Sequence, residues 1–180
     1  MTEDTIDLTT RVRWDDMRAP ASLINPAGSI APPSISTDDG SLVFSKGKAV
    51  AIWFQFPHGW LEGSDIIPHI HFSKTTVGVG YPNFKIKYKW ANIGDVFPAF
   101  NTLIPGTLEV SDDNTINKNA LISFGHIPSI GKKISSMICV YLERVNDTSD
   151  TYAGDIKLYE LDIHYQVDAF GSIQEFIKEG

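Results

Sequence analysis

Two histidines two positions apart are the residues of this sequence best suited to bind a metal ion. His69 and His71 would point to the same face of a β-strand, because successive side chains along a strand alternate between its two faces. Neutral imidazole is a good ligand for Zn, Fe, Ni and Cu. His58, beyond a turn, could supply a further ligand. These three histidines are the candidate metal ligands.

The histidine pair also resembles the opening of the first cupin motif: a Gly, five residues, His-X-His, and a Glu three or four residues later. Gly63, His69 and His71 match this opening, but Thr75 and Thr76 stand where the motif has its Glu. No second motif with a further histidine follows. Because catalytic zinc sites usually have three protein ligands, we expect the histidines to be structural, with no bound metal and no cofactor. A cupin-like metal-binding enzyme is the alternative that the resemblance leaves open.

A second set of polar residues lies on one face of the last predicted strand. Glu160, Asp162, His164 and Gln166 share this face, and a carboxylate beside an imidazole could tune a catalytic base. No nucleophile accompanies them, since the single cysteine, Cys139, lies in an apolar run and is interpreted as a small buried hydrophobe. We therefore predict that the protein is not an enzyme and that this face is a subunit contact.

Aromatic and basic residues have weaker functional interpretations. Four aromatic residues could line a sugar-binding surface: Trp53, Trp60, Trp90 and Phe97. In a strand-rich chain, however, most aromatic residues belong to the core. Three lysines alternate along one strand and are interpreted as a solvated face: Lys85, Lys87 and Lys89. A carbohydrate-binding module remains an alternative class.

The overall composition is that of one globular domain. The 180 residues carry a formal net charge of −7, and 42% are hydrophobic and 21% charged. Nucleic-acid binding needs clustered Lys and Arg to neutralise phosphates, so we expect no nucleic-acid partner. The first residues lack the basic and then apolar pattern of a signal peptide, and no apolar stretch reaches transmembrane length. We expect no membrane partner and assembly in a reducing cytoplasm.

The elements that must position these residues are β-strands. The alternation of Phe84, Ile86, Tyr88 and Trp90 with lysines predicts a half-buried strand. Further strands are predicted over residues 50–56, 66–75, 102–110, 120–124, 134–145 and 156–167. With Gly, Pro, Asn and Asp turns between them, this pattern predicts an all-β fold, a β-sandwich of the jelly-roll type.

Residues 1–40 differ from the β-sandwich domain predicted over residues 41–180. Four prolines are interspersed there with Ser, Thr, Asn and Gly, and no strand period persists. Proline removes a hydrogen-bond donor and fixes φ, so the segment is predicted to be an extended arm without regular structure. Trp14 is an apolar point on this arm that the domain or a neighbouring subunit must bury.

Four segments resemble small structural proteins of tailed bacteriophages and prophages. They are residues 12–20, 57–72, 88–97 and 164–175, with Val-Arg-Trp-Asp-Asp-Met-Arg-Ala-Pro in the first and His-Tyr-Gln-Val-Asp opening the last. None is a catalytic motif, and together they span most of the chain. The resemblance implies a jelly-roll-like subunit of a virion, assembled in the host cytoplasm.

These observations together predict a non-enzymatic bacteriophage virion protein that assembles with copies of itself. The head is the favoured location, as a capsid decoration, cement or head-fibre protein beside the major capsid protein; a tail, fibre or baseplate component that contacts host glycan is the alternative. The resemblance favours a homotrimer. The expected interface residues are Trp14, Glu160, Asp162, His164, Gln166, Phe170, Ile173 and Phe176.

Overall fold

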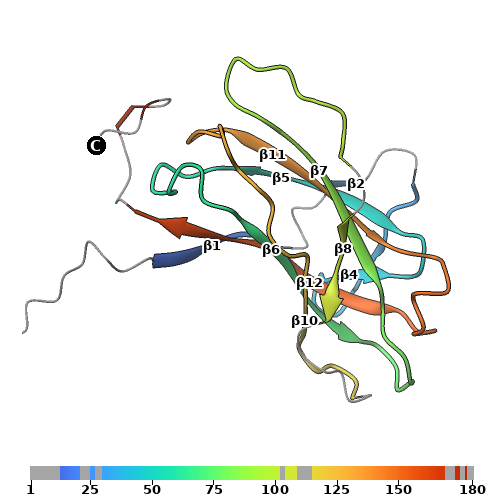
Figure 1. Cartoon of the computed structure of the whole chain (residues 1–180). Helices are drawn as coiled ribbons and strands as arrows, with labels where there is room; N and C mark the ends of the chain where they lie inside the picture. Colours follow the sequence, from blue (N-terminus) through green and yellow to red (C-terminus); the bar gives the residue numbers. More distant parts are fainter. Residues whose placement is uncertain are drawn as a thin grey trace, which may run out of the picture.

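The described part of the protein consists of β-strands and loops arranged in two layers (Figure 1). The structure is a computed structural model, and it describes residues 13–20, 25–26, 30–101, 104–108, 115–168, 173–174 and 177. Every pairing between the strands is antiparallel.

The larger layer is called the β12 sheet and has seven strands among the described residues. Six follow in the order β3 (Ser34–Ile35), β4 (Leu42–Phe44), β12 (Ile156–Val167), β6 (Ile67–Lys74), β10 (Ala120–Ser123) and β9 (Thr107–Leu108). The seventh, β1 (Arg13–Pro20), also pairs with β12. The long strand β12 therefore holds this layer together.

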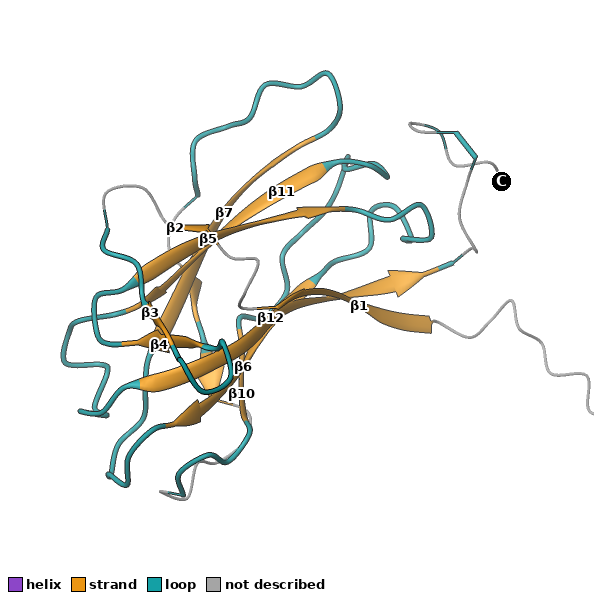
Figure 2. Ribbon diagram, turned by 180° about the vertical axis from the view of Figure 1, so that it is seen from behind, coloured by secondary structure: helices purple, strands orange, loops and turns teal. Residues whose placement is uncertain are grey.

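The smaller layer is called the β11 sheet and has five strands in the part of the chain that the structure describes. Their order is β2 (Asn25–Pro26), β5 (Ala49–Gln55), β11 (Met137–Arg144), β7 (Phe84–Ala91) and β8 (Ile104–Pro105). From β4 to β7 and again from β10 to β12, the chain changes sheet at every step. This alternation between two facing sheets is the jelly-roll arrangement, and Figure 2 shows the two layers from behind. The predicted fold class is confirmed.

The core lies between the sheets and is rich in aromatic residues. Trp60 and Trp90 are buried as predicted, and both pack against Phe56, with ring centroids 4.5 and 4.4 Å from it. The indole N–H groups donate to Ser64 and Ser136, so both rings bury their apolar surface without leaving a donor unpaired. Trp53 and Phe97 were also expected in the core, but both are exposed.

The expectation that residues 1–40 lack regular structure is wrong for β1. This strand pairs with β12 over its whole length, from Arg13 opposite Val167 to Pro20 opposite Glu160. Burial is confined to a few of its residues: Ala19 is buried, and Asp16 and Met17 are half-buried. The strand was missed because the inward-facing residues are small or flexible, and because the backbone ladder is independent of side-chain apolarity.

A β-bulge in β12 changes which of its side chains face the core. The register shifts between Leu158 and Glu160, and the buried residues on either side of the shift are Leu158 and Leu161. Tyr159, at the shift itself, is half-buried, with its hydroxyl 2.6 Å from Ser73 Oγ. A bulge inserts one extra residue into one strand, which reverses the alternation beyond it.

One buried charge joins both sheets to the loop between β11 and β12. Arg144, at the end of β11, and Asp150 have fully buried side chains, and Arg144 Nε lies 2.8 Å from Asp150 Oδ2. The guanidinium also donates to the carbonyls of Phe44, Gly154 and Tyr152 at 2.8, 2.8 and 2.7 Å. With its Nη2 contact to Asp150 Oδ1 at 3.2 Å, every N–H of the guanidinium has an acceptor.

We expect Arg144→Met to lower the free energy of unfolding by about 3–5 kcal/mol, because it leaves the Asp150 carboxylate buried without its main partner. Lys85→Met is the matched control, since Lys85 pairs with Asp147 of the same loop at 3.4 Å but at the surface. Its expected loss is below about 1 kcal/mol. Urea unfolding followed by tryptophan fluorescence measures both; equal losses would contradict this account.

Candidate functional site

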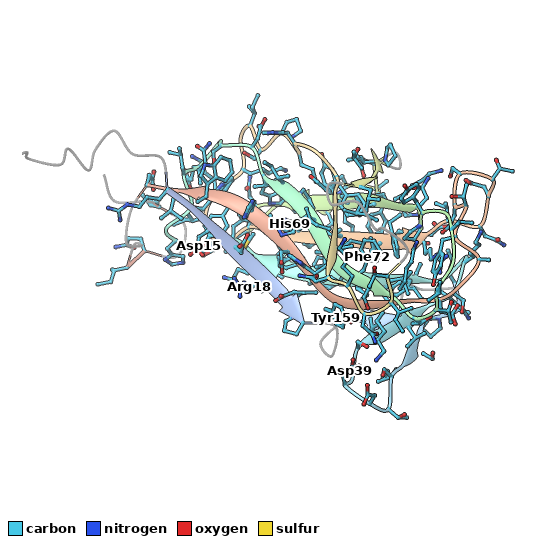
Figure 3. All side chains as sticks on the ribbon, turned by 90° about the horizontal axis from the view of Figure 1, so that it is seen from below. Asp15, Arg18, Asp39, His69, Phe72 and Tyr159 are labelled. Atoms are coloured by element: carbon cyan, nitrogen blue, oxygen red, sulfur yellow. The ribbon has the colours of Figure 1, made fainter. Side chains whose placement is uncertain are left out.

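Polar side chains from three adjacent strands meet on the outer face of the β12 sheet. The register places Asp16 of β1 opposite His164 of β12, and it places His69 of β6 opposite Asp162 on the other side of β12. Figure 3 shows β1, β12 and β6 side by side, with Arg18 and His69 labelled. We call this group the histidine–aspartate cluster: Asp16, Arg18, His69, His71, Glu160, Asp162 and His164.

Asp162 is the centre of the cluster. Its side chain is 4% exposed, and its Oδ2 lies 3.3 Å from His69 Nε2 and 3.5 Å from His71 Nε2. The carboxylate that was missing after the His-X-His pair is thus supplied from β12. No local pattern could have shown this, because Asp162 is distant in sequence and only the strand pairing brings it beside the two histidines.

His164 joins the cluster from the side of β1. Its Nε2 lies 2.8 Å from Asp16 Oδ1, and its ring centroid is 4.9 Å from that of His69. The ring of Trp14 lies beyond it, at a centroid distance of 6.1 Å. The cluster therefore continues without interruption from His71 to the exposed tryptophan of β1.

The negative charge of Asp162 acts to raise the pKa of two neighbouring side chains, His69 and Glu160. Burial by itself would lower the pKa of His69, but contact with the Asp162 carboxylate outweighs it, so the pKa is raised above 6.5. Burial and the charge of Asp162 raise the pKa of Glu160. The cluster thus favours cations close to Asp162.

A hollow of about 400 Å³ opens beside the cluster. His71 and Asp162 line it together with Glu160 and Tyr159, and His71 Nδ1 lies 3.3 Å from Asn119 Oδ1 at its edge. His58, the third candidate ligand, is not part of the cluster: its Nε2 lies 2.9 Å from Ser135 Oγ. The hollow gives solvent access to His71, whose side chain is 30% exposed.

The residues expected at a subunit interface differ in their exposure. Trp14 is 45% exposed and Ile173 is 89% exposed, so both have apolar surface that this chain does not cover. Glu160, His164 and Gln166 are half-buried. Asp162 is buried among the described residues, and its place in an interface stays a prediction. Phe170 and Phe176 lie outside the described residues.

A second surface lies on the outer face of the β11 sheet. Trp53 of β5 is 42% exposed and forms an edge-to-face pair with Phe97 at 5.2 Å between ring centroids. Lys89 Nζ lies 5.3 Å from the centroid of the Trp53 ring, and Lys87 Nζ lies 4.2 Å from that of Tyr141. The lysine row is therefore not simply solvated, because these ammonium groups lie over aromatic faces.

The comparisons with known proteins give likenesses of fold. No protein-family model and no curated protein sequence matches the chain. Within the described part of the chain, no helix is long and apolar enough to cross a membrane.

Among solved structures, the xylan-binding module CBM15 is similar over 86% of this chain and 99% of its own, at 14% identity and a TM-score of 0.49. The CBM36-1 domain of a multidomain xylanase from the hindgut metagenome of Trinervitermes trinervoides is similar over 83% of this chain and 96% of its own. The sequence identity is 8% and the TM-score is 0.46. A chain of infectious bursal disease virus, Gx strain, is similar over 91% of this chain but 34% of its own. The sequence identity is 13% and the TM-score is 0.39. These values identify no function for this chain.

Charge reversal distinguishes the two acidic residues that β12 contributes to the cluster, Glu160 and Asp162. Asp162→Lys should lower the free energy of unfolding by more than about 3 kcal/mol, because it buries a cation without an anionic partner. Glu160→Lys, at the half-buried neighbouring position, should change it by less than about 1 kcal/mol. Urea unfolding of both variants measures the difference, and a stable Asp162→Lys protein would show that Asp162 is not held inside the chain.

Proposed function

We propose that this protein is a non-enzymatic structural subunit of a bacteriophage virion that assembles with copies of itself. The favoured location is the head, as a decoration, cement or head-fibre protein in contact with the major capsid protein. The observation that carries the proposal is Trp14, a tryptophan left 45% exposed on an edge strand beside a row of polar groups. Large exposed aromatics with polar neighbours are typical of the centre of a subunit contact.

The segments that resemble phage structural proteins support the proposal by their position. The first contains β1, the second ends in β6, and the last begins within β12, so three segments far apart in sequence form one continuous surface. The loop before β6 also contacts the end of β12, where Leu61 N donates to Gln166 O at 2.8 Å. A surface assembled in this way is suited to recognition, although no catalytic set accompanies it.

The edge of β1 supports assembly through this surface. Within the described residues β1 pairs with β12 alone, so its other edge presents backbone donors and acceptors to a neighbour. At one end the paired β1 and β12 extend sideways from the two layers (Figure 2). In the proposal, residues 1–40 act as an arm between subunits of a homotrimer, and Phe170, Ile173 and Phe176 complete the contact.

A second candidate function rests on the outer face of the β11 sheet. The pair of Trp53 and Phe97, with Lys89 over it, exposes flat aromatic surface of the kind on which sugar rings stack. This observation favours a tail, fibre or baseplate component that contacts host glycan. The two candidates use different tryptophans, so they can be tested separately.

Trp14→Ala should weaken self-association and leave the β-sheet fold intact, because the side chain is on the surface of the single chain. Sedimentation velocity over a concentration series measures the oligomer, and the proposal expects the trimer to dissociate at least about tenfold more readily. Trp53→Ala, which removes a similarly exposed tryptophan from the other sheet, is the control. A wild-type chain that stays monomeric at high concentration and is missing from purified particles would refute the proposal.

Trp53→Ala should instead abolish retention on a glycan array if the second candidate is correct, while Trp14→Ala binds normally. The expected loss follows from removing the stacking surface while Phe97 alone remains. Circular dichroism confirms that both variants are folded. If the wild-type protein binds no glycan, or if both variants bind equally, the second candidate is eliminated.

A further inference from the structure

We propose that His69, His71 and Asp162 form a binding site for a divalent transition-metal ion of the Zn²⁺ type on the outer face of the β12 sheet. The inference goes beyond the structural function proposed above, and it does not depend on it. Sequence alone favoured structural histidines because no carboxylate follows the His-X-His pair, and the pairing of β6 with β12 removes that objection.

The spacing of the three groups fits one ion. One ligand atom from each residue lies within 4.8 Å of those of the other two. Asp162 Oδ2 is 3.3 Å from one imidazole Nε2 and 3.5 Å from the other. Ligand atoms about 2.1 Å from the same ion at tetrahedral angles are about 3.4 Å apart. Charge-assisted hydrogen bonds are shorter, at about 2.7–2.9 Å, so the observed separations match a coordination shell better than a direct hydrogen-bonded pair.

The burial of Asp162 is the second, independent observation. The side chain is 4% exposed, and its Oδ1 has no hydrogen-bond partner among the described residues. A buried carboxylate oxygen without a donor is costly, and a cation held at this carboxylate would offset that cost. This oxygen is not the one that faces the histidines, so an ion at the site would satisfy it by being bound through both oxygens of the carboxylate.

The surroundings of the histidines suit ligands held in a fixed orientation. The far nitrogen of His71, Nδ1, faces Asn119 Oδ1 at 3.3 Å, and such partners fix the ring and its tautomer in metal sites. The hollow lined by His71 and Asp162 leaves the remaining coordination positions open to water. The ring of His69 is anchored from the opposite side by its packing against His164.

The ligand set determines the class of ion. Two imidazole nitrogens and one carboxylate oxygen suit Zn²⁺, Fe²⁺, Co²⁺ or Ni²⁺. Mg²⁺ and Ca²⁺ prefer shells made of oxygen alone. An ion here would link β6 to β12 by bonds to side chains, in addition to the backbone ladder between them.

The test is isothermal titration of the full chain with Zn²⁺ after treatment with a chelator. We expect one equivalent to bind, no heat from Mg²⁺ or Ca²⁺ under the same conditions, and a rise in thermal midpoint with Zn²⁺ concentration because the ion binds the folded state. His71→Ala should weaken Zn²⁺ binding at least about tenfold and reduce the thermal shift. His71 is the preferred target because its side chain is 30% exposed, whereas His69 and Asp162 are buried and their variants are less certain to fold.

His126→Ala is the matched control, because His126 also faces an aspartate, Asp65, at 3.8 Å, but at an exposed site away from the cluster. It should bind Zn²⁺ as the wild type does. The visible absorption of the Co²⁺-loaded protein gives a readout of the ligand set that a structural role for the histidines would not produce, and it should disappear in His71→Ala. The absence of Zn²⁺ binding, or binding unchanged by His71→Ala, would overturn the proposal.

Discussion

The fold depends on the burial of one guanidinium group between the two sheets. Arg144 contacts the carbonyl at the end of β4 and two carbonyls of the loop between β11 and β12, and its charge is balanced by Asp150. Asp150 in turn accepts a hydrogen bond from the backbone N–H of Asn83, just before β7. Because a buried ion pair is stable only when its remaining donors and acceptors are satisfied, the surrounding segments have little freedom to move apart.

This constraint reaches the histidine–aspartate cluster through β12. The loop held by Arg144 leads directly into that strand, so its start is fixed against β4. The bulge between Leu158 and Glu160 then reverses the alternation of side chains. If the same sequence paired with β6 in regular alternation, without the bulge, Asp162 would point into the apolar core and Leu161 would point away from it. The position of the cluster thus depends on a single irregularity in an otherwise regular ladder.

The sequence predicted those parts of the fold in which the local pattern of side chains is strong. The lysine-separated run that became β7 follows from its period-two pattern, and the run that became β11 follows from a continuous apolar stretch. The bulge in β12 has no such signal, because it depends on the strands on both sides. Only part of the candidate site could be predicted from the sequence, for the same reason. The His-X-His pair is a local pattern, but Asp162 reaches it only through the pairing of β6 with β12. Trp53 was assigned to the core because exposed and buried aromatics look alike in sequence.

The central position of β12 also affects how the chain can fold during synthesis. Its partners β1, β4 and β6 all precede it in sequence, and β1 is separated from it by most of the chain. Until residues 156–167 leave the ribosome, none of these strands can form its native ladder with β12, and their edges stay open to other contacts. Folds dominated by such distant pairings form slowly, and open strand edges favour aggregation. Chaperones should therefore matter most for the nascent chain just before residues 156–167 emerge and the sheet closes.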